Sequence, residues 1–200
     1  MSRCLGNNYW QDMSPYSFSP YSFTPKIKYK FMERKIALIT GATSGIGEAC
    51  ARKFACGGYD LILTGRNVDK LKAVEAAARG LGADVLPLVF DVRDRNAATA
   101  AVGSLTGKWA EVDVLVNNAG LALGLEKEYE GDLDDWETMI DTNVKGLLTM
   151  TRLIVPGMVE RNRGHVINIG SVAGDAAYAG GNVYCATKAA VKAITDGLRI

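Results

Sequence analysis

KIALITGATSGIG, residues 35–47, is the stretch that decides the fold of this chain. Its first six residues are mostly apolar, which is typical of a buried strand. Gly41-Ala42-Thr43-Ser44-Gly45-Ile46-Gly47 follows, and residues 45–56 have a helical pattern. Glycines between a strand and a helix let the backbone approach a phosphate, and the first N–H groups of the helix can bind it. The sequence therefore predicts a nucleotide-binding turn, with a purely structural turn as the alternative.

The rest of the chain alternates between short β-branched runs and helical stretches. We expect strands at residues 35–40, 59–64, 85–90, 112–117 and 164–170. We expect helices at residues 45–56, 68–80, 94–105, 134–161 and 184–199. Strands that are apolar on both faces and alternate with helices are typical of a parallel sheet covered on both sides. The predicted fold class is therefore α/β, with a doubly wound parallel sheet.

Two of these helices have a readable apolar face. The helix expected at residues 68–80 follows Asn67, which can serve as its N-cap. One face of this helix carries Leu71, Val74 and Ala78. The face of the longer stretch, at the same spacing, is formed by Val144, Leu147, Leu148, Thr151, Ile154 and Met158. Pro156 lies within that stretch and predicts a kink or an early end of the helix.

Composition and charge exclude several classes of protein. The 200 residues are 48% hydrophobic and 22% charged, and the formal net charge is +1. This balance gives no electrostatic basis for binding nucleic acid or an acidic membrane surface. No apolar run reaches the roughly 20 residues that span a bilayer. The four cysteines have no metal-ligand spacing, so we expect no metal site and a reducing, cytoplasmic environment.

Residues 1–31 differ in composition from the remainder. They hold no alanine, one acidic residue and two copies of the sequence SPYSF, at residues 14–18 and 19–23. Such a segment lacks the periodicity of a helix or strand, so we expect a disordered N-terminal extension. An aromatic tail that binds a partner is the alternative. The predicted domain then covers residues 32–200.

The end of the second expected strand indicates which cofactor the chain prefers. An acidic residue there would bind a ribose 2′-hydroxyl, whereas a basic residue would accommodate a 2′-phosphate. The sequence is Leu63-Thr64-Gly65-Arg66-Asn67, with no acidic residue in reach of Arg66. Arginine pairs well with phosphate through its planar guanidinium group. This favours NADP (or NADPH) over NAD, unless Arg66 is only a solvated loop residue.

A catalytic pair is predicted near the C-terminus. Of the eight tyrosines, only Tyr184 has a lysine four residues later, Lys188. On a helix this spacing places both side chains on one face. A nearby ammonium group stabilises a phenolate, so such a tyrosine can exchange a proton with an alcohol or carbonyl during hydride transfer. Tyr178 is expected to line the substrate pocket only, because its i+4 residue is Asn182.

From Lys35 to Arg199 the chain resembles the short-chain dehydrogenase/reductase family. The residues that carry the resemblance are TGATSGIG at 40–47, Asn117-Asn118-Ala119-Gly120, Asn143, Ser171 and Tyr184-Cys185-Ala186-Thr187-Lys188. The resemblance implies a Rossmann fold and an oxidoreductase that acts on CH–OH groups. Residues 117–125, 135–146, 156–163 and 178–184 further resemble the NADP-dependent 3-hydroxy acid dehydrogenases, which act on serine, allo-threonine and related 3-hydroxy acids.

The resemblance implies a role for each matched residue. Tyr184 would be the general acid/base, and Lys188 would support it and bind the nicotinamide ribose. Ser171 would bind the substrate oxygen, and Asn143 would hold a water in a proton relay. The adenosine half of the cofactor would contact Asp91, Val92, Asn118, Ala119 and Gly120. The structural alternatives are a turn residue for Ser171, backbone support for Asn143 and a helix cap for Asp91.

Three functions remain open. The first is an NADP-dependent oxidoreductase on a small 3-hydroxy acid or its carbonyl partner. The second is the same chemistry on another alcohol, and the third is a catalytically inactive nucleotide-binding fragment. The family pattern continues past Ile200 with two more strands and a substrate-covering loop, so we expect a domain that is truncated at its C-terminus. The family also implies a homodimer or tetramer through the helices at 144–161 and 184–200, weakened here by the shorter second helix.

Overall fold

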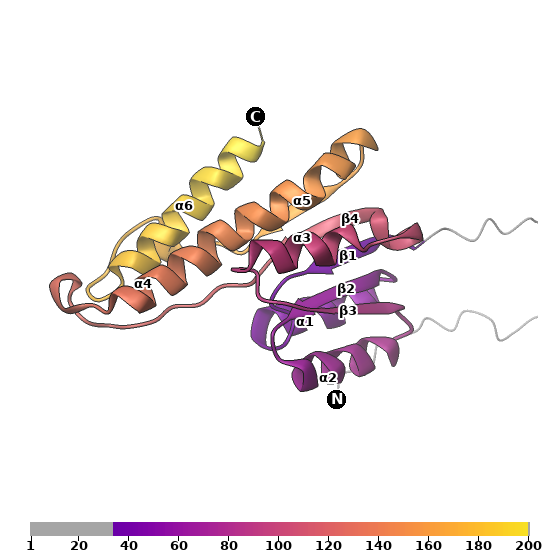
Figure 1. Ribbon diagram of the computed structural model, residues 1–200, viewed down its shortest axis with the longest axis horizontal. Coiled ribbons are helices and arrows are strands. Elements are labelled where there is room, and N and C mark those ends of the chain that lie inside the picture. Colours follow the sequence, from indigo (N-terminus) through magenta and orange to yellow (C-terminus); the bar gives the residue numbers. More distant parts are fainter. Residues whose placement is uncertain (1–33, 200) are drawn as a thin grey trace, which may run out of the picture. The chain divides into compact units, whose positions relative to one another are not determined.

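A parallel sheet of five strands lies at the centre of the part of the chain that the computed structural model describes, residues 34–199 (Figure 1). The strand order is β3-β2-β1-β4-β5. The strands are β1 (Ile36–Ile39), β2 (Asp60–Gly65), β3 (Val85–Val89), β4 (Val112–Asn117) and β5 (His165–Asn168). The chain crosses from one side of β1 to the other between β3 and β4, and ligands of such sheets bind beyond the carboxyl ends of the strands at this point.

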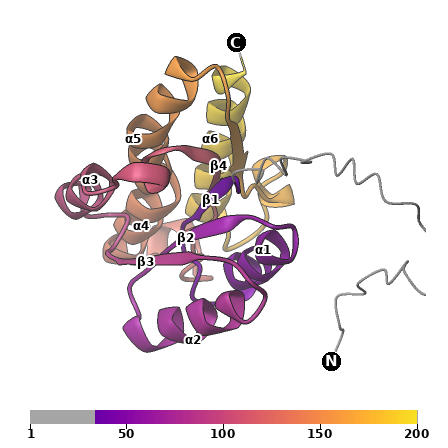
Figure 2. The same ribbon diagram turned by 90° about the vertical axis from the view of Figure 1, so that its right-hand side faces the viewer.

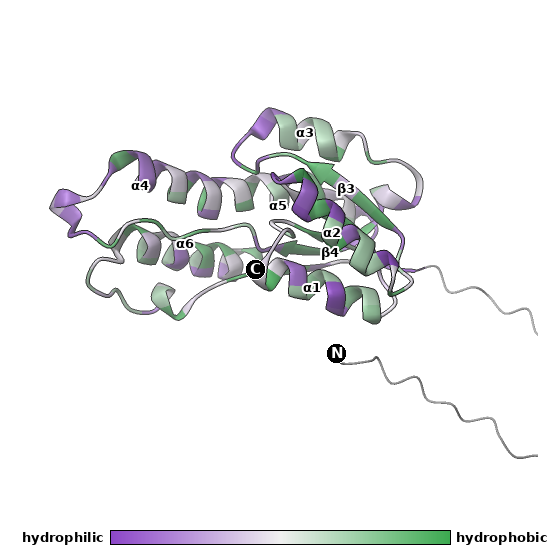
Figure 3. Cartoon of the chain, turned by 90° about the horizontal axis from the view of Figure 1, so that it is seen from below, coloured by the Kyte–Doolittle hydropathy of each residue, from purple (hydrophilic) through white to green (hydrophobic). Residues whose placement is uncertain are grey.

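Helices alternate with the strands along the sequence, as predicted. They are α1 (Gly45–Cys56), α2 (Val68–Arg79), α3 (Arg95–Gly103), α4 (Leu133–Ile140), α5 (Leu147–Glu160) and α6 (Asn182–Leu198). Shorter 3-10 turns occupy Gly107–Ala110, Glu128–Glu130 and Val172–Gly174. Figures 1 and 3 show α4 and α6 running side by side, and the two helices are in contact. This fold confirms the predicted doubly wound α/β class.

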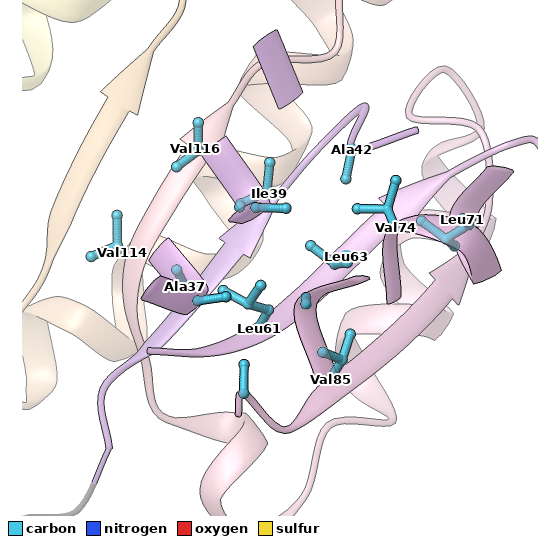
Figure 4. Packing of buried hydrophobic residues seen from close by; sticks show 14 residues of the cluster. Ala37, Ile39, Ala42, Leu61, Leu63, Leu71, Val74, Val85, Val114 and Val116 are labelled. Carbon is cyan, nitrogen blue, oxygen red and sulfur yellow. The ribbon is translucent and has the colours of Figure 1, made fainter. Parts of the chain in front are cut away.

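Two apolar clusters form the core, one on each face of the sheet. Helices α1 and α2 cover the first face, where Leu71 and Val74 pack over Leu63 and Val85 (Figure 4). Helices α3 and α5 cover the second, where Met150 and Ile154 pack against the sheet (Figure 2). The strands are correspondingly apolar, as the green of β3 and β4 shows in Figure 3. The predicted face of α2 is buried, and Asn67 Oδ1 accepts the capping hydrogen bond from Lys70 N at 2.9 Å.

Full burial of the strands holds only for the middle of the sheet. Every residue of β1, β2 and β4 is buried. In contrast, β3 and β5 are only partly covered and lie at the edges of the sheet. The expected coverage of both sides of the sheet therefore holds for the three middle strands and is incomplete at β3 and β5. Strand β5 presents an unpaired edge within the described residues, and such edges can pair with other chains.

The helical stretch predicted at 134–161 is not one regular helix. Helices α4 and α5 are joined by a π-helical turn, Asp141–Gly146, which shifts the residues that follow around the helix axis. Most of the predicted apolar face is buried: Leu147, Thr151, Ile154 and Met158. Leu148, also predicted to face the core, is 43% exposed, and Met150 is buried although it was not predicted. Helix α5 also continues through Pro156 to Glu160, so the early end predicted there is wrong.

The predictions for residues 1–31 lie outside the described residues. Among the residues that the structure does describe, no helix combines the length and the apolar character needed to cross a membrane.

Candidate active site

The glycine turn between β1 and α1 is held by close backbone contacts. Gly41 has φ +63°, a left-handed conformation that favours glycine, and a Cβ there would lie 2.8 Å from Ala119 Cα. A Cβ on Gly47 would fall on the carbonyl oxygen of Gly41. Asn118 Nδ2 donates to Thr40 O at 2.9 Å and to Gly41 O at 3.0 Å. The turn and the end of β4 are therefore built against each other.

The amino end of α1 faces the same region. Ser44 is its N-cap residue, and its side chain makes no capping hydrogen bond. Thr43, Ser44, Gly45 and Ile46 line a cavity, with the Ile46 side chain exposed. The first N–H groups of a helix carry partial positive charge and bind phosphate well. The turn can thus bind a pyrophosphate, as the sequence predicts.

Replacement of Gly47 with alanine is expected to damage this turn. The new methyl group would overlap the Gly41 carbonyl, and such overpacking costs about 1–3 kcal/mol. We expect a lower thermal midpoint and weaker binding of ADP, measured by calorimetry. Gly103→Ala is the matched control, because no heavy atom lies within 4 Å of a Cβ at Gly103. Equal ADP affinity in the two variants would contradict the assignment of this turn.

Arg66 and Asp91 lie together where β2 and β3 end. Arg66 Nη1 is 3.5 Å from Asp91 Oδ2, so the expectation that no acidic residue is in reach of Arg66 is wrong. The contact arises because Gly65 pairs with Val89 in the parallel sheet, which brings the residues after the two strands together. Arg93 binds the same carboxylate through its backbone and side chain. Burial raises the pKa of Asp91, but the hydrogen bonds from Arg93 outweigh this and hold it below its usual value.

Helix α6 places Tyr184 and Lys188 one turn apart, as predicted. Lys188 Nζ lies 5.9 Å from the centre of the Tyr184 ring and donates a hydrogen bond to Ile169 O at 2.8 Å. Tyr184 is half-buried, whereas Lys188 is buried, and burial lowers the pKa of the lysine below its usual value. A positively charged group is thus fixed beside a phenol that lines the cavity.

Asn143 lies in the π-helical turn and supports the loop after β4. Its Oδ1 accepts a hydrogen bond from Leu121 N at 2.9 Å, and its Nδ2 donates to Leu121 O at 2.8 Å. The same Nδ2 donates to Thr187 Oγ1 at 3.1 Å, and Thr187 Oγ1 donates to Tyr184 O at 2.7 Å. The structure shows this backbone support directly. Asn143 is not among the residues that line the cavity, and its relay role stays a prediction.

Ser171 follows β5 and opens the 3-10 turn Val172–Gly174. Its Oγ accepts a hydrogen bond from Ala173 N at 3.1 Å, so it does cap a turn. Ser171 also lines the cavity with Tyr184 and Lys188. The hydroxyl group can therefore serve the turn as an acceptor while it keeps its own proton for another partner.

A single cavity of about 590 Å³ brings most of the predicted residues together. Its lining includes Gly41, Thr43, Ser44, Gly45, Ile46, Arg66, Asp91, Val92, Asn118, Ala119, Gly120, Ser171, Tyr184 and Lys188. Gly47 and Asn143 do not line the cavity. The cavity lies beyond the carboxyl ends of the strands, the usual position for a ligand in this type of sheet.

The sequence analysis missed several lining residues. These are Thr64, Gly65, Phe90, Leu121, Ala122, Thr142, Ile169 and Gly170. Most of them are at or just after the end of a strand, and that position alone could have indicated them. Thr64 Oγ1 and Thr142 Oγ1 are buried and have no hydrogen-bond partner. Buried polar atoms are normally paired, so both hydroxyl groups are suited to a polar ligand.

A second cavity, of about 380 Å³, adjoins Tyr184. Tyr178 lines it together with Leu123, Trp136 and Met139, and its place in the substrate pocket stays a prediction. Its acidic lining residues are Glu126, Glu128, Asp132 and Asp135, and its described lining contains no lysine or arginine. Within residues 34–199, these carboxylates included, no group of three or more His, Cys, Asp or Glu side chains could hold a metal ion.

Comparison with known proteins gives curated relatives of high identity. The chain is 56% identical over 164 residues to the NADP-dependent 3-hydroxy acid dehydrogenase YdfG of Salmonella typhi, and this covers 82% of the chain and 65% of that protein. It is 45% identical over 162 residues to the serine 3-dehydrogenase of Rhizobium radiobacter, with coverage of 81% and 64%. The chain thus spans about two thirds of the length of these relatives.

A solved structure and a family model agree with these matches. The crystal structure of serine dehydrogenase from Escherichia coli is similar with a TM-score of 0.78 and 51% identity, covering 82% of this chain and 74% of that one. A closed form of serine dehydrogenase complexed with NADP+ matches with the same TM-score and identity and 65% coverage of that chain. The model of the short chain dehydrogenase family matches residues 35–200. The chain therefore belongs to the short-chain dehydrogenase family.

Proposed function

We propose that this chain is an NADP-dependent oxidoreductase that transfers a hydride between the cofactor and the 3-hydroxyl or carbonyl group of a small 3-hydroxy acid. One observation carries the proposal: the glycine turn, Ser171, Tyr184 and Lys188 line the same cavity. The names of the relatives support both the cofactor and the substrate class. The 32–200 domain boundary is part of the same proposal.

The residues of the cavity fit NADP. Gly41 and Gly47 let the turn pack closely on itself and on the end of β4. The first residues of α1 then line the cavity, where their N–H groups can bind a pyrophosphate. Thr64 and Thr142 each offer an unpaired buried hydroxyl group on the wall of the cavity. Arg66 supplies a cation for the 2′-phosphate, and Val92, Asn118, Ala119 and Gly120 complete the surface around the adenosine half.

Tyr184 performs the proton transfer. Bound NADP supplies the hydride acceptor, and NADPH the donor in the reverse direction. During oxidation Tyr184 takes the proton from the substrate hydroxyl oxygen, and during reduction it returns a proton to the carbonyl oxygen. Lys188 stabilises the phenolate through its charge, because it is fixed 5.9 Å from the Tyr184 ring.

Ser171 and Asn143 prepare the site for this step. Ser171 donates its hydroxyl proton to the substrate oxygen and so orients it toward Tyr184. Asn143 holds Leu121 and Thr187 in place and thereby fixes both the loop after β4 and the helix that carries Tyr184. We also retain the water-mediated relay through Asn143 as part of the proposal.

A second candidate is the same chemistry on an alcohol without a carboxylate. The carboxylates that line the second cavity favour a neutral or cationic substrate, and its described lining supplies no cation for an acid. Serine and allo-threonine carry an ammonium group that suits this acidic cavity. 3-Hydroxypropionate carries a carboxylate and no ammonium group, so it suits the cavity less well. A panel of substrates can separate the two candidates.

The test is the absorbance of reduced nicotinamide with the full 200-residue chain. NADP or NAD is supplied with serine, allo-threonine, 3-hydroxypropionate or a neutral alcohol. We expect turnover with serine or allo-threonine, and faster turnover with NADP than with NAD. Turnover with the neutral alcohol alone would favour the second candidate. Binding of NADP without turnover of any substrate would contradict the proposed catalysis.

A further inference from the structure

Three charged side chains gather where β2 and β3 end, and only two of them reach the cavity. Arg66 and Asp91 line the cavity, whereas Arg93 does not line it and contacts Asp91. Arg66 Nη1 is 3.5 Å from Asp91 Oδ2. Arg93 makes three shorter contacts with the same carboxylate: N to Oδ1 at 3.0 Å, Nε to Oδ2 at 3.0 Å and Nη2 to Oδ2 at 2.8 Å.

Taken alone, Asp91 would oppose the binding of a 2′-phosphate. A carboxylate beside Arg66 cancels the positive charge of that guanidinium group and repels a phosphate dianion. A free carboxylate in this part of the fold would also suit a ribose 2′-hydroxyl, the group that NAD presents. Two residues on the cavity wall therefore favour different cofactors.

Arg93 changes this balance. With Arg66 and Asp91 alone the net charge is zero, and with Arg93 it is +1. Arg93 also satisfies both carboxylate oxygens, so Asp91 has less capacity to accept a further hydrogen bond. Thr138 Oγ1 lies 3.5 Å from Arg93 Nη1 and holds the far side of the guanidinium group. The remaining charged group near Arg93 is Asp141, which is paired with Lys145 at 2.6 Å.

We propose that Arg93 is a positioning residue that sets the preference for a 2′-phosphorylated nucleotide, because it neutralises Asp91 and leaves Arg66 free to bind the phosphate. This inference rests on the proposed function, since it places the adenosine half of NADP beside Arg66 and Asp91. Arg93 touches neither the phosphate nor the reacting atoms and acts through Asp91.

The test is the affinity of the full chain for two nucleotides, measured by calorimetry. 2′,5′-ADP is AMP with an added 2′-phosphate, so AMP is the matched probe that lacks only this group, and neither nucleotide requires catalysis. Arg93→Gln is expected to lower the ratio of the 2′,5′-ADP affinity to the AMP affinity roughly twofold to fivefold. Arg95→Gln is the matched control: Arg95 is an exposed arginine two residues away that does not line the cavity. We expect it to keep the ratio.

A second variant separates this role from a merely structural one. If Arg93→Gln only disturbed the structure, it would weaken the binding of both nucleotides and leave the ratio of their affinities unchanged. That result would overturn the inference. In an Asp91→Asn background, Arg93→Gln should have no effect on the ratio, because no carboxylate remains to be neutralised. An equal effect in both backgrounds would show that Arg93 binds the phosphate directly and would also overturn it.

The same measurements distinguish failure of the proposed function from failure of the role proposed for Arg93. If the unaltered chain does not bind 2′,5′-ADP more tightly than AMP, the proposed NADP preference is wrong, and the inference is overturned with it. If the unaltered chain shows the preference and Arg93→Gln retains it, the proposed function stands and only the role of Arg93 is overturned.

Discussion

Tyr184→Phe is expected to lower turnover about 10²- to 10⁴-fold, the usual contribution of a positioned acid/base group. The change removes only the phenol oxygen, so the ring still packs on α6 beside Lys188. No other group that lines the cavity combines a titratable hydroxyl with a lysine at 5.9 Å, among the residues that the structure describes. The loss should therefore fall on kcat. It is measured by the absorbance of reduced nicotinamide.

Tyr59→Phe is the matched control for this prediction. It removes the same oxygen from a ring that packs edge-on against Phe54, with the centres 5.0 Å apart, in the core between α1 and the sheet. We expect near-parental turnover. Affinity for 2′,5′-ADP should survive in both variants, which shows that the cavity is still folded. Comparable turnover by Tyr184→Phe and the unaltered chain would contradict the acid/base role.

Local signals explain why the glycine turn and its helix could be predicted from the sequence. The glycines, the preceding apolar strand and the following helical pattern lie within about twenty neighbouring residues, and α1 has the predicted bounds. Tyr184 and Lys188 are also close in sequence, and a helix brings any two residues at this spacing together. Both parts of the site are therefore visible from residues close together in the sequence, although distant residues such as Asn118 also hold the turn in the fold.

The π-helical turn could not be predicted in this way. Its sequence, DTNVKG, has no proline, and its one glycine, Gly146, does not by itself indicate a π-helical turn. The turn is supported from outside by the hydrogen bonds between Asn143 and Leu121. Leu121 is 22 residues away in the chain. A periodicity that assumes a regular helix cannot show a turn that depends on such a distant contact. The predicted apolar face of α5 is nevertheless mostly correct, because Leu147, Thr151, Ile154 and Met158 are buried, whereas Leu148 is exposed.

The pairing of Arg66 with Asp91 was missed for a similar reason. The two residues are 25 positions apart, and only the register of β2 against β3 brings them together. Sequence reasoning treated Arg66 as a cation without a partner and Asp91 as a separate adenine contact. The structure shows one charged cluster of Arg66, Asp91 and Arg93.

Lys188→Met is expected to lower turnover roughly 10²-fold or more, the lower end of the range for acid/base catalysis. The variant keeps the length of the side chain but removes the charge that stabilises the Tyr184 phenolate. It also removes the hydrogen bond to Ile169 O. This loss of activity has a counterpart in stability, because Lys188 is a buried charge.

The pH dependence of stability should reveal that burial. Burial lowers the pKa of Lys188 in the folded chain below the ordinary value of 10.5. At a pH between the lowered pKa of the folded chain and the ordinary value of 10.5, the unfolded chain binds more protons than the folded chain. The stability of the unaltered chain therefore rises with pH in this range. The methionine variant lacks this gain. The midpoint difference, that of Lys188→Met minus that of the unaltered chain, should therefore be highest near neutral pH. It should fall as the pH approaches 10.5.

Lys192→Met is the matched control, one turn further along α6. Lys192 is exposed and forms an ion pair with Asp175, and the hydrogen bond with Asp175 raises its pKa. The sign is therefore reversed: this pair stabilises the fold at neutral pH and loses its effect as the pH rises above the ordinary lysine value. The midpoint difference should rise with pH for Lys192→Met and fall for Lys188→Met. Parallel curves would contradict the buried charge at Lys188, and retained turnover in Lys188→Met would contradict its support of Tyr184.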